Sequence, residues 1–405
     1  HWLFFHWVCL PITLFGLYRH GRGLRRKHGT EKNFPKTMRL MRNDTDMKTL
    51  YSICIIMGAL WGSAVHLQGH EKPGQSIKTN LIPQEKEMDA YLMVFHKDET
   101  HGLYMAVSYD GYTFTALNDG EPVIAGDTIA LQRGIRDPHI FRGPDGAFYL
   151  VMTDLHIYAR REGYRDTEWE RDGKKYGWGN NRGLVLMKSI DMINWNRTNL
   201  RMDNLSDEYK EIGCAWAPET TYDESEGKLM IYYTMRFGKG QNRIYYFYVN
   251  DDFDKMESMP KLLFEYPKKD IAAIDGDITK VGGQYHLFYV SHDGTAGVKQ
   301  AVSAQINAGY TYLPGWVDPE PKSCEAPNLW KRIGENNWVL MYDCYGIAKH
   351  NFGFVETSDF EHFIPLGRFN EGPMKATNFS SPKHDAVIQI TAEEAGRLEK
   401  HWSKK

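Results

Sequence analysis

The chain has 405 residues, 42% of them hydrophobic and 25% charged, which is the balance of a globular protein with one large domain or two ordinary ones. Its formal net charge of −3 excludes a globally basic surface, so nothing in the composition favours nucleic acid as a partner. Five cysteines without CxxC spacing exclude a zinc site and a disulfide framework, so we expect buried free thiols. The 13% of aromatic residues suits both a strand-rich fold and the stacking of sugar rings.

The first ninety residues differ from the remainder. We interpret residues 1–46, apolar and then basic, as an upstream extension foreign to the native protein, with a membrane anchor as the alternative. Residues 47–69 predict a signal peptide that starts at Met47, because a short basic region, an apolar run and small residues follow one another. Polar residues 70–89 predict a linker. We therefore expect a secreted or periplasmic protein, no stable membrane insertion of the mature domain, and a folded body over 90–405.

One sequence unit recurs four times in this body. Each copy has a short alternating strand, a turn with Gly or Asn, and a continuous apolar strand, which together predict a β-hairpin. A second unit of a strand, a polar turn and an aromatic residue follows each hairpin. The two units predict four antiparallel strands, which make one blade of a β-propeller. The copies begin at Asp137, Ala217, Asp275 and Ala326.

A fifth blade is expected to combine the two ends of the body. The segment from Ala90 has the pattern of the later strands of a blade, and the segment from His384 that of an innermost strand. Joining them closes the ring and leaves no exposed sheet edge at that point. The predicted fold is therefore an all-β, five-bladed β-propeller whose fifth blade is closed by both chain ends.

Residues that open the innermost strands should meet at one mouth of the channel. In four blades an acidic residue stands at this position, and burying an unpaired carboxylate is costly. Such a set indicates function, although capping of strands or pairing with Arg236 and histidines is the alternative for each acid taken singly. The openers are Asp137, Glu219, Asp275, Glu325 and His384.

Glycoside hydrolysis explains a cluster of this kind. One carboxylic acid protonates the leaving oxygen while a carboxylate deprotonates water on the other ring face, and inverting enzymes hold the two roughly 6.5–9.5 Å apart. A third carboxylate nearby raises the pKa of the acid by like-charge repulsion. Carboxylates on different blades, facing one another across a narrow channel, suit these separations.

Over roughly residues 90–400 the chain resembles the family-43 glycoside hydrolases. The resemblance rests on the order of short motifs, one per blade, since each motif alone is common. The third motif departs from the family pattern, because Gly276 replaces the usual proline and Asp277 competes with Asp275 for the same role. The matching motifs are Asp137-Pro138, Trp216-Ala217-Pro218, Ile274-Asp275, Glu325-Ala326-Pro327 and the late His384.

The resemblance implies a role for each motif residue. Asp137 would be the general base, Glu325 the general acid, and Asp275 would tune and orient Glu325. His384 would reach a structural calcium on the channel axis through water, and the chemistry would require no cofactor. Glu219 would bind a sugar hydroxyl, or act as the acid if the repeat is wrongly phased. Further candidates for substrate contacts are Trp216 by stacking, and Arg236, His156 and His292 by hydrogen bonds.

The resemblance favours an inverting, exo-acting α-L-arabinofuranosidase that acts on side chains of plant polysaccharides. A monomer with an oligo- or polysaccharide as its partner is expected. The long insertion after His156 favours a closed pocket. Its loop around Trp178 is a candidate wall of that pocket, and a plain turn of the chain is the alternative. Open alternatives are a β-xylosidase, an endo-arabinanase, an exo-galactanase, a retaining hydrolase, a phosphorylase, and a non-catalytic carbohydrate- or protein-binding propeller.

Overall fold

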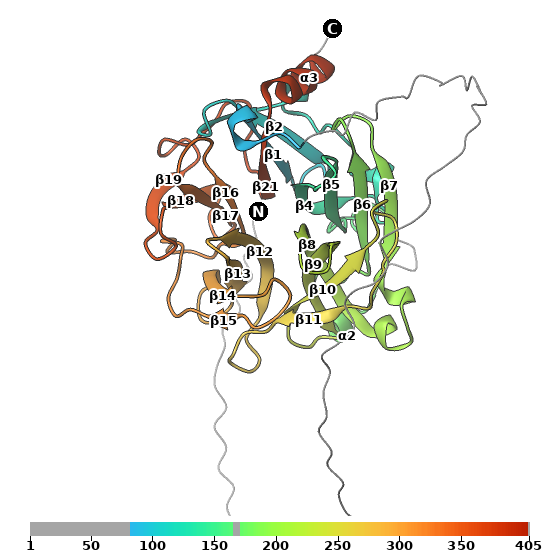
Figure 1. Cartoon of the computed structure of the whole chain (residues 1–405). Helices are drawn as coiled ribbons and strands as arrows, with labels where there is room; N and C mark the ends of the chain where they lie inside the picture. The colour runs from blue at the N-terminus through green and yellow to red at the C-terminus, as the bar shows by residue number, and fades with distance from the viewer. Residues whose placement is uncertain (1–81, 165–170, 404–405) are drawn as a thin grey trace, which may run out of the picture. The chain divides into compact units, whose positions relative to one another are not determined.

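The computed structural model describes residues 82–164 and 171–403. The predicted upstream extension, the signal peptide and most of the linker lie outside these residues. Figure 1 shows five sheets arranged radially around a central axis, with one strand of each nearest to it. Four sheets have four strands that follow the chain from the axis outward, and the remaining sheet has five. The prediction of a five-bladed β-propeller is confirmed.

The first two blades follow one another along the chain, each built from consecutive antiparallel strands. The first blade contains β4 (Ile135–Arg142), β5 (Phe148–Asp154), β6 (Gly183–Ser189) and β7 (Asn196–Arg201). The second contains β8 (Ile212–Asp223), β9 (Lys228–Phe237), β10 (Arg243–Val249) and β11 (Lys261–Phe264).

The third and fourth blades repeat the same order. The third contains β12 (Ala273–Val281), β13 (Gln284–Ser291), β14 (Gly297–Ser303) and β15 (Thr311–Tyr312). The fourth contains β16 (Glu325–Lys331), β17 (Trp338–Cys344), β18 (Asn351–Thr357) and β19 (Ile364–Arg368).

The fifth blade joins the two ends of the body, as predicted. Its innermost strand is β21 (Lys383–Ile390), which pairs antiparallel with β1 (Ala90–His96). β2 (Leu103–Ser108) and β3 (Thr113–Ala116) continue the sheet outward, and β20 (Lys375–Ala376) adds a short parallel edge. The ring is thereby closed by hydrogen bonds between segments almost 300 residues apart, and not by a covalent link.

Helices are short and peripheral. They are α1 (Gly126–Ile129), α2 (Gly173–Tyr176) and α3 (Ala392–Trp402), with 3₁₀ turns η1 (Glu85–Glu87), η2 (Asn118–Gly120), η3 (Met202–Asn204) and η4 (Glu208–Glu211). A capping box between Thr391 and Glu394 starts α3. Among the described residues, no helix combines the length and the apolar character that a membrane crossing requires.

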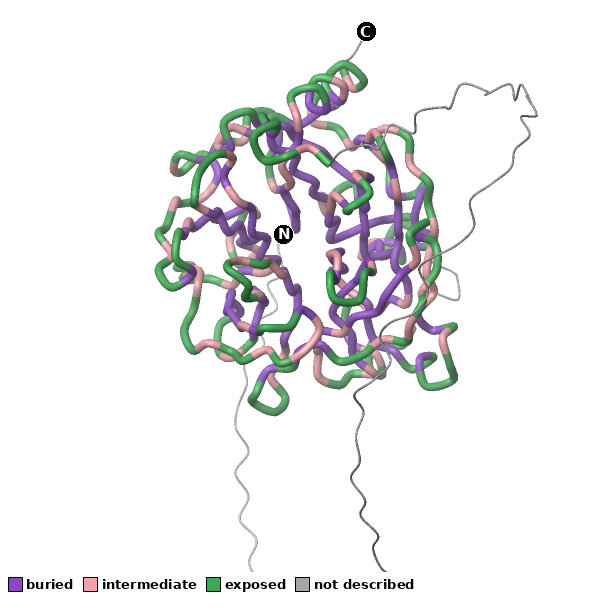
Figure 2. Tube along the Cα trace, in the orientation of Figure 1, coloured by how far each residue is buried: buried purple, intermediate pink, exposed green. Residues whose placement is uncertain are grey.

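The hydrophobic core lies between neighbouring blades. Figure 2 shows buried strands surrounded by exposed loops, and β1, β5 and β17 are buried along their whole length because both of their faces are covered. The cluster between the fifth and first blades contains Leu92 and Val94 facing Ile140 and Leu150. Cys214, Cys324 and Cys344 are buried free thiols, as the sequence predicted.

All five innermost strands share one irregularity. Each contains a non-glycine residue with a positive φ of 41–55°, and in each the pairing with the second strand shifts register at that point. A bulge of this kind re-aims side chains, and clusters of such strained residues mark functional sites. The five residues are Asp137, Ala217, Asp275, Ala326 and His384.

Candidate active site

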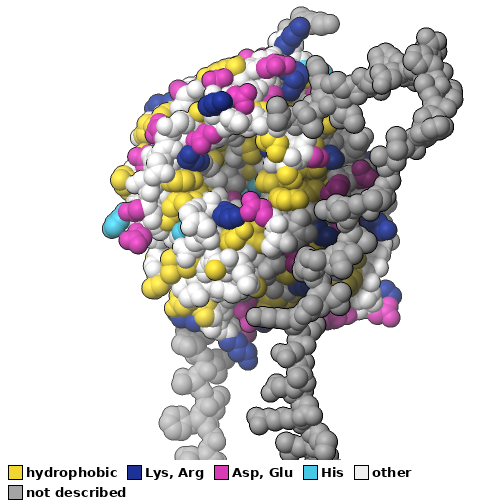
Figure 3. Space-filling view, viewed as in Figure 1, with side chains coloured by type: hydrophobic (Ala, Val, Ile, Leu, Met, Phe, Trp, Pro, Cys, Tyr) yellow, Lys and Arg dark blue, Asp and Glu magenta, His cyan; other side chains and the backbone are white. Residues whose placement is uncertain are grey.

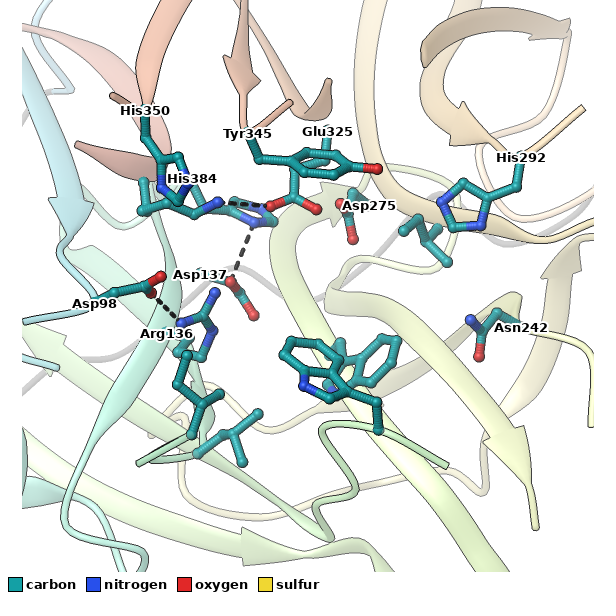
Figure 4. A pocket seen from close by; sticks show the side chains of 16 residues that line it. Asp98, Arg136, Asp137, Asn242, Asp275, His292, Glu325, Tyr345, His350 and His384 are labelled. Carbon is teal, nitrogen blue, oxygen red and sulfur yellow. Dashed lines mark hydrogen bonds and ion pairs between the residues drawn. The ribbon is translucent and has the colours of Figure 1, made fainter. Parts of the chain in front are cut away.

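A pocket of about 460 Å³ opens at the mouth where the five bulges lie. Every innermost strand contributes to its wall, either with the bulge residue or with the residue before it. The bulges therefore convert a repeated backbone feature into one ring of side chains. Figure 4 shows these side chains around the pocket, and the ones from the bulges are Arg136, Asp137, Trp216, Ile274, Asp275, Glu325, Lys383 and His384.

The three predicted catalytic carboxylates meet in this pocket. Asp137 comes from β4, Asp275 from β12 and Glu325 from β16, so they approach from three different blades. In Figure 4 all three carboxylates point toward the same space. Asp137 and Asp275 are 8% and 7% exposed, so the protein and not bulk water determines their ionisation.

Asp137 is held as a carboxylate. Its Oδ1 lies 3.1 Å from Nδ1 of His384, and its Oδ2 accepts a hydrogen bond of 2.6 Å from Oγ1 of Thr153. Burial disfavours the charge, but His384 and Arg136 outweigh it and hold the pKa of Asp137 well below its usual value. Burial likewise disfavours the His384 cation, yet Asp137 raises the pKa of His384 to about 9. At neutral pH this is an ion pair with an ionised base.

Glu325 has a cationic neighbour that the sequence did not point to. Nζ of Lys383 lies 2.9 Å from Oε1 of Glu325 and 2.9 Å from Oδ2 of the fully buried Asp343. Burial raises the pKa of Glu325, but Lys383 more than offsets this, and the net pKa lies below its usual value. In this state Glu325 is ionised.

The pKa of Asp275 is shifted in the opposite direction. Its backbone N donates to Oγ1 of Thr234 at 3.0 Å, and its Oδ2 accepts from the backbone N of Ala326 at 3.3 Å. Burial, with the charges of Glu325 and Asp137, raises the pKa of Asp275 to about 7, although His384 acts in the opposite direction. Asp275 and Glu325 influence each other directly, so they titrate as a pair that holds one proton near neutrality.

The predicted substrate-binding residues divide into two groups. Trp216 and His292 line the pocket, whereas Glu219, Arg236 and His156 do not. Glu219 is buried in β8, two residues beyond the bulge residue Ala217. There Oη of Tyr232 donates a hydrogen bond of 2.6 Å to Oε2 of Glu219. Arg236 donates to backbone carbonyls beneath the pocket wall. The ring of His156 stacks on that of His101 with centroids 3.8 Å apart.

Several pocket residues were missed by the sequence analysis. Arg136 and Lys383 stand one residue before a bulge, which is the position that Glu325 occupies in its own blade. Arg136 forms an ion pair with Asp98, visible in Figure 4. The phase of the repeat would have identified both cations. The other missed residues, Asp98, Asn242, Tyr345 and His350, come from other segments that no repeat position marks.

A second ring of polar side chains lies behind the first. It ties neighbouring blades together through backbone amides: Thr220 donates to Nδ1 of His139 at 3.2 Å, and Leu329 donates to Oδ2 of Asp277 at 3.1 Å. Burial and then Asp277 raise the pKa of Glu219 well above its usual value. The structure thus places Asp275 in the pocket and Asp277 in this supporting ring.

Three buried side chains of this ring are of the types that ligate metals. Ligand atoms of His139, Glu219 and Asp277 lie within 4.8 Å of one another. The group fits a metal poorly, because Nδ1 of His139 already accepts a hydrogen bond, which leaves the proton on Nε2. His384, as an imidazolium, has no free lone pair for direct ligation. A calcium on the axis, contacted through water, stays a prediction.

Three carboxylates lie around one propeller mouth, and the pKa of Asp137 is lowered while that of Asp275 is raised. A glycoside hydrolase uses carboxyl groups in such an arrangement. A family model described as a probable glycosyl hydrolase domain, related to family 43, matches residues 86–396. The chain belongs to this family of glycoside hydrolases.

Individual relatives are distant. An α-L-arabinofuranosidase of Bifidobacterium longum is 24% identical over 207 residues, which are 46% of this chain and 18% of the relative's length. The chain therefore spans less than a fifth of that protein. A family-43 protein of Bacillus licheniformis is similar in structure, with a TM-score of 0.48 and 15% identity over 75% of this chain and 56% of the other. The structure of an α-L-arabinanase of Cellvibrio cellulosa, solved with arabinohexaose, is also similar. Its TM-score is 0.44 and its sequence identity 14%, and the match covers 69% of this chain and 95% of the arabinanase.

Proposed function

We propose that this chain is an inverting, exo-acting glycoside hydrolase for side chains of plant polysaccharides, and in particular an α-L-arabinofuranosidase. One observation carries the proposal: carboxylates from three blades face a single pocket, and their surroundings shift their pKa values in different directions. A sugar-binding propeller without catalysis would have no use for this difference, because hydroxyl groups can be bound by neutral donors and acceptors.

In the proposed mechanism Asp137 is the general base. It takes a proton from a water molecule whose oxygen attacks the anomeric carbon. Its ion pair with His384 keeps it ionised and fixes one carboxylate oxygen, and Thr153 fixes the other. As the bond from carbon to the leaving oxygen breaks, Glu325 gives that oxygen a proton.

The proton that Glu325 delivers is held at rest by Asp275. We assign Asp275 this storage role because it is buried, protonated near neutrality and electrostatically linked to Glu325. Transfer of the proton from Asp275 to Glu325 makes Glu325 the acid and leaves Asp275 charged. After the reaction Asp137 has gained one proton and the pair has lost one, and exchange with solvent restores the resting state.

A screen with nitrophenyl α-L-arabinofuranoside, β-D-xyloside and β-D-galactoside tests the proposal. We expect nitrophenol release from the arabinofuranoside, and its loss in Asp137→Asn. The His362→Gln variant, altered at an exposed side chain far from the pocket, is the matched control and keeps the wild-type rate. Preference for the xyloside or galactoside would reassign the substrate to β-xylosidase or exo-galactanase activity. No release from any of the three, or an unchanged rate in Asp137→Asn, would contradict the proposal.

A further inference from the structure

An indole ring with most of its surface in solvent lies at the rim of the pocket. Trp178 is 69% exposed and still lines the same cavity as the carboxylates. Its ring meets that of Trp216 at an angle of 61°, with centroids 6.0 Å apart. Trp216 belongs to the inner strand β8 and is less exposed, so the two rings form a corner that leads from the pocket wall to the outside.

The backbone around Trp178 is fixed to the second blade. Nη2 of Arg236 donates to the carbonyl oxygens of Tyr176 and Trp178, at 2.9 and 3.0 Å. Nε1 of Trp216 donates to the carbonyl oxygen of Gly179 at 2.8 Å. Arg236 itself is 6% exposed and lies over the Trp216 ring at 4.5 Å. The backbone position of Trp178 is therefore set by the buried Arg236 and the partly buried Trp216.

Glycines on both sides of Trp178 make this attachment sterically possible. Gly177 has a φ of 82°, and a Cβ there would lie 3.0 Å from Nη2 of Arg236. Gly179 has a φ of 60°, and a Cβ there would lie 3.1 Å from the Trp216 ring. Both conformations favour glycine, and both close approaches need it. The loop is thus built to hold Trp178 against the second blade, and does more than turn the chain.

A single exposed aromatic residue is common on protein surfaces. This one differs because it is preorganised beside an active site, where rigidity of an anchor lowers the entropy lost on binding. An indole face carries partial negative charge and attracts C–H groups with partial positive charge, such as those on the flat side of a sugar ring. Figure 3 shows charged groups of both signs interspersed with hydrophobic ones on the visible face.

We propose that Trp178 is the stacking platform for a second sugar ring of the substrate, next to the ring whose bond is hydrolysed. The inference rests on the proposed function and adds to it a preference for oligosaccharides over substrates with a single sugar. The corner of Trp178 and Trp216 holds the second ring by its apolar face. Trp178 is then a specificity-determining residue that the propeller places through its insertion in the first blade.

The test compares a trisaccharide with a one-sugar substrate. For Trp178→Ala we expect kcat/KM on α-1,5-arabinotriose to fall about tenfold more than kcat/KM on methyl α-L-arabinofuranoside, the equivalent of one lost aromatic contact. Trp178→Phe should retain most of the trisaccharide activity. Trp316→Ala is the matched control, because Trp316 is also exposed, at 45%, but lines a different depression. An equal loss on both substrates in Trp178→Ala would overturn the proposal.

Binding measurements separate this proposal from the function on which it rests. In the Glu325→Gln background, titration with arabinotriose and with xylotriose should give a Kd that rises about tenfold when Trp178→Ala is added. If the wild type hydrolyses nothing while binding depends on Trp178, the hydrolase function fails and the sugar platform stands. If neither trisaccharide binds, or if Trp178→Ala leaves both Kd values unchanged, the platform is refuted whatever the catalytic result.

Discussion

Lys383 should control the pH range in which the acid works. Its side chain is 4% exposed and bridges Glu325 and Asp343, at 2.9 Å to each. At 2.9 Å an ion pair is worth about 6 kcal/mol with an effective dielectric constant of about 20. Solvent at Glu325, whose side chain is 26% exposed, and the sharing of the charge with Asp343 reduce the effect on either acid. We therefore expect Lys383→Met to move the alkaline limb of the pH profile upward by about 1–3 pH units.

The assay must use a poor leaving group. A nitrophenolate departs without a proton, so kcat/KM should be followed from pH 4 to pH 10 on arabinotriose, where the acid is needed. Lys383→Met alone leaves Asp343 buried without its cation, at a cost of about 3–5 kcal/mol in the free energy of unfolding. The double variant Lys383→Met/Asp343→Asn removes both charges and keeps the fold. Asp343→Asn alone leaves Lys383 on Glu325 and should not raise the limb. An alkaline limb that stays in place in the double variant would refute the reasoning.

Three further outcomes follow from the same geometry. Glu325→Gln should lower kcat/KM on arabinotriose by about 10²–10⁴-fold and affect a dinitrophenyl glycoside much less, and equal losses would argue against an acid at this position. Asp137 raises the pKa of His384 from 6.5 in the unfolded chain to about 9 in the folded protein. The contribution of protonated His384 to the free energy of unfolding is therefore fully present below pH 6.5 and is lost as the pH rises through 9. The Tm difference between wild type and His384→Gln should shrink over that interval, whereas a constant difference would contradict the pairing. Arg142→Met should lower the free energy of unfolding by about 1–3 kcal/mol in denaturant titrations. The variant removes two hydrogen bonds, of 2.8 and 2.6 Å, from Arg142 on β4 to Glu394 on α3. An unchanged free energy of unfolding would show the pair to be dispensable.

Much of the fold could be predicted because its signals are local. Alternating and continuous apolar runs recur at each blade, and the closure of the ring followed from incomplete patterns at Ala90 and His384. The bulges could not be predicted, since a register shift depends on the pairing of two strands and leaves no pattern in either. They determine which of two nearby acids faces the pocket, and they place Asp275 there while Asp277 joins the supporting ring.

The candidate site was predicted in part for the same reason. Asp137 lies at one bulge and Glu325 immediately before another, and both belong to short motifs that the sequence could mark. Glu219 and Arg236 have charged side chains like the pocket residues, but they are engaged elsewhere. Glu219 accepts a hydrogen bond from Tyr232, and Arg236 donates to loop carbonyl oxygens. These are tertiary contacts, which the spacing of residues along the sequence does not reveal. The repeat phase marks the position of Lys383, but its contacts with Glu325 and Asp343 join two blades and exist only in the folded chain.

The configuration of the released sugar tests the central claim most directly. Proton NMR during the first minutes of arabinotriose hydrolysis shows which anomer forms before mutarotation equilibrates the two. With Asp137 activating water opposite to Glu325, the first product should have the anomeric configuration opposite to that of the substrate. A first product that retains the substrate's configuration would show that a carboxylate attacks the sugar itself, and would contradict the roles assigned to Asp137 and Glu325.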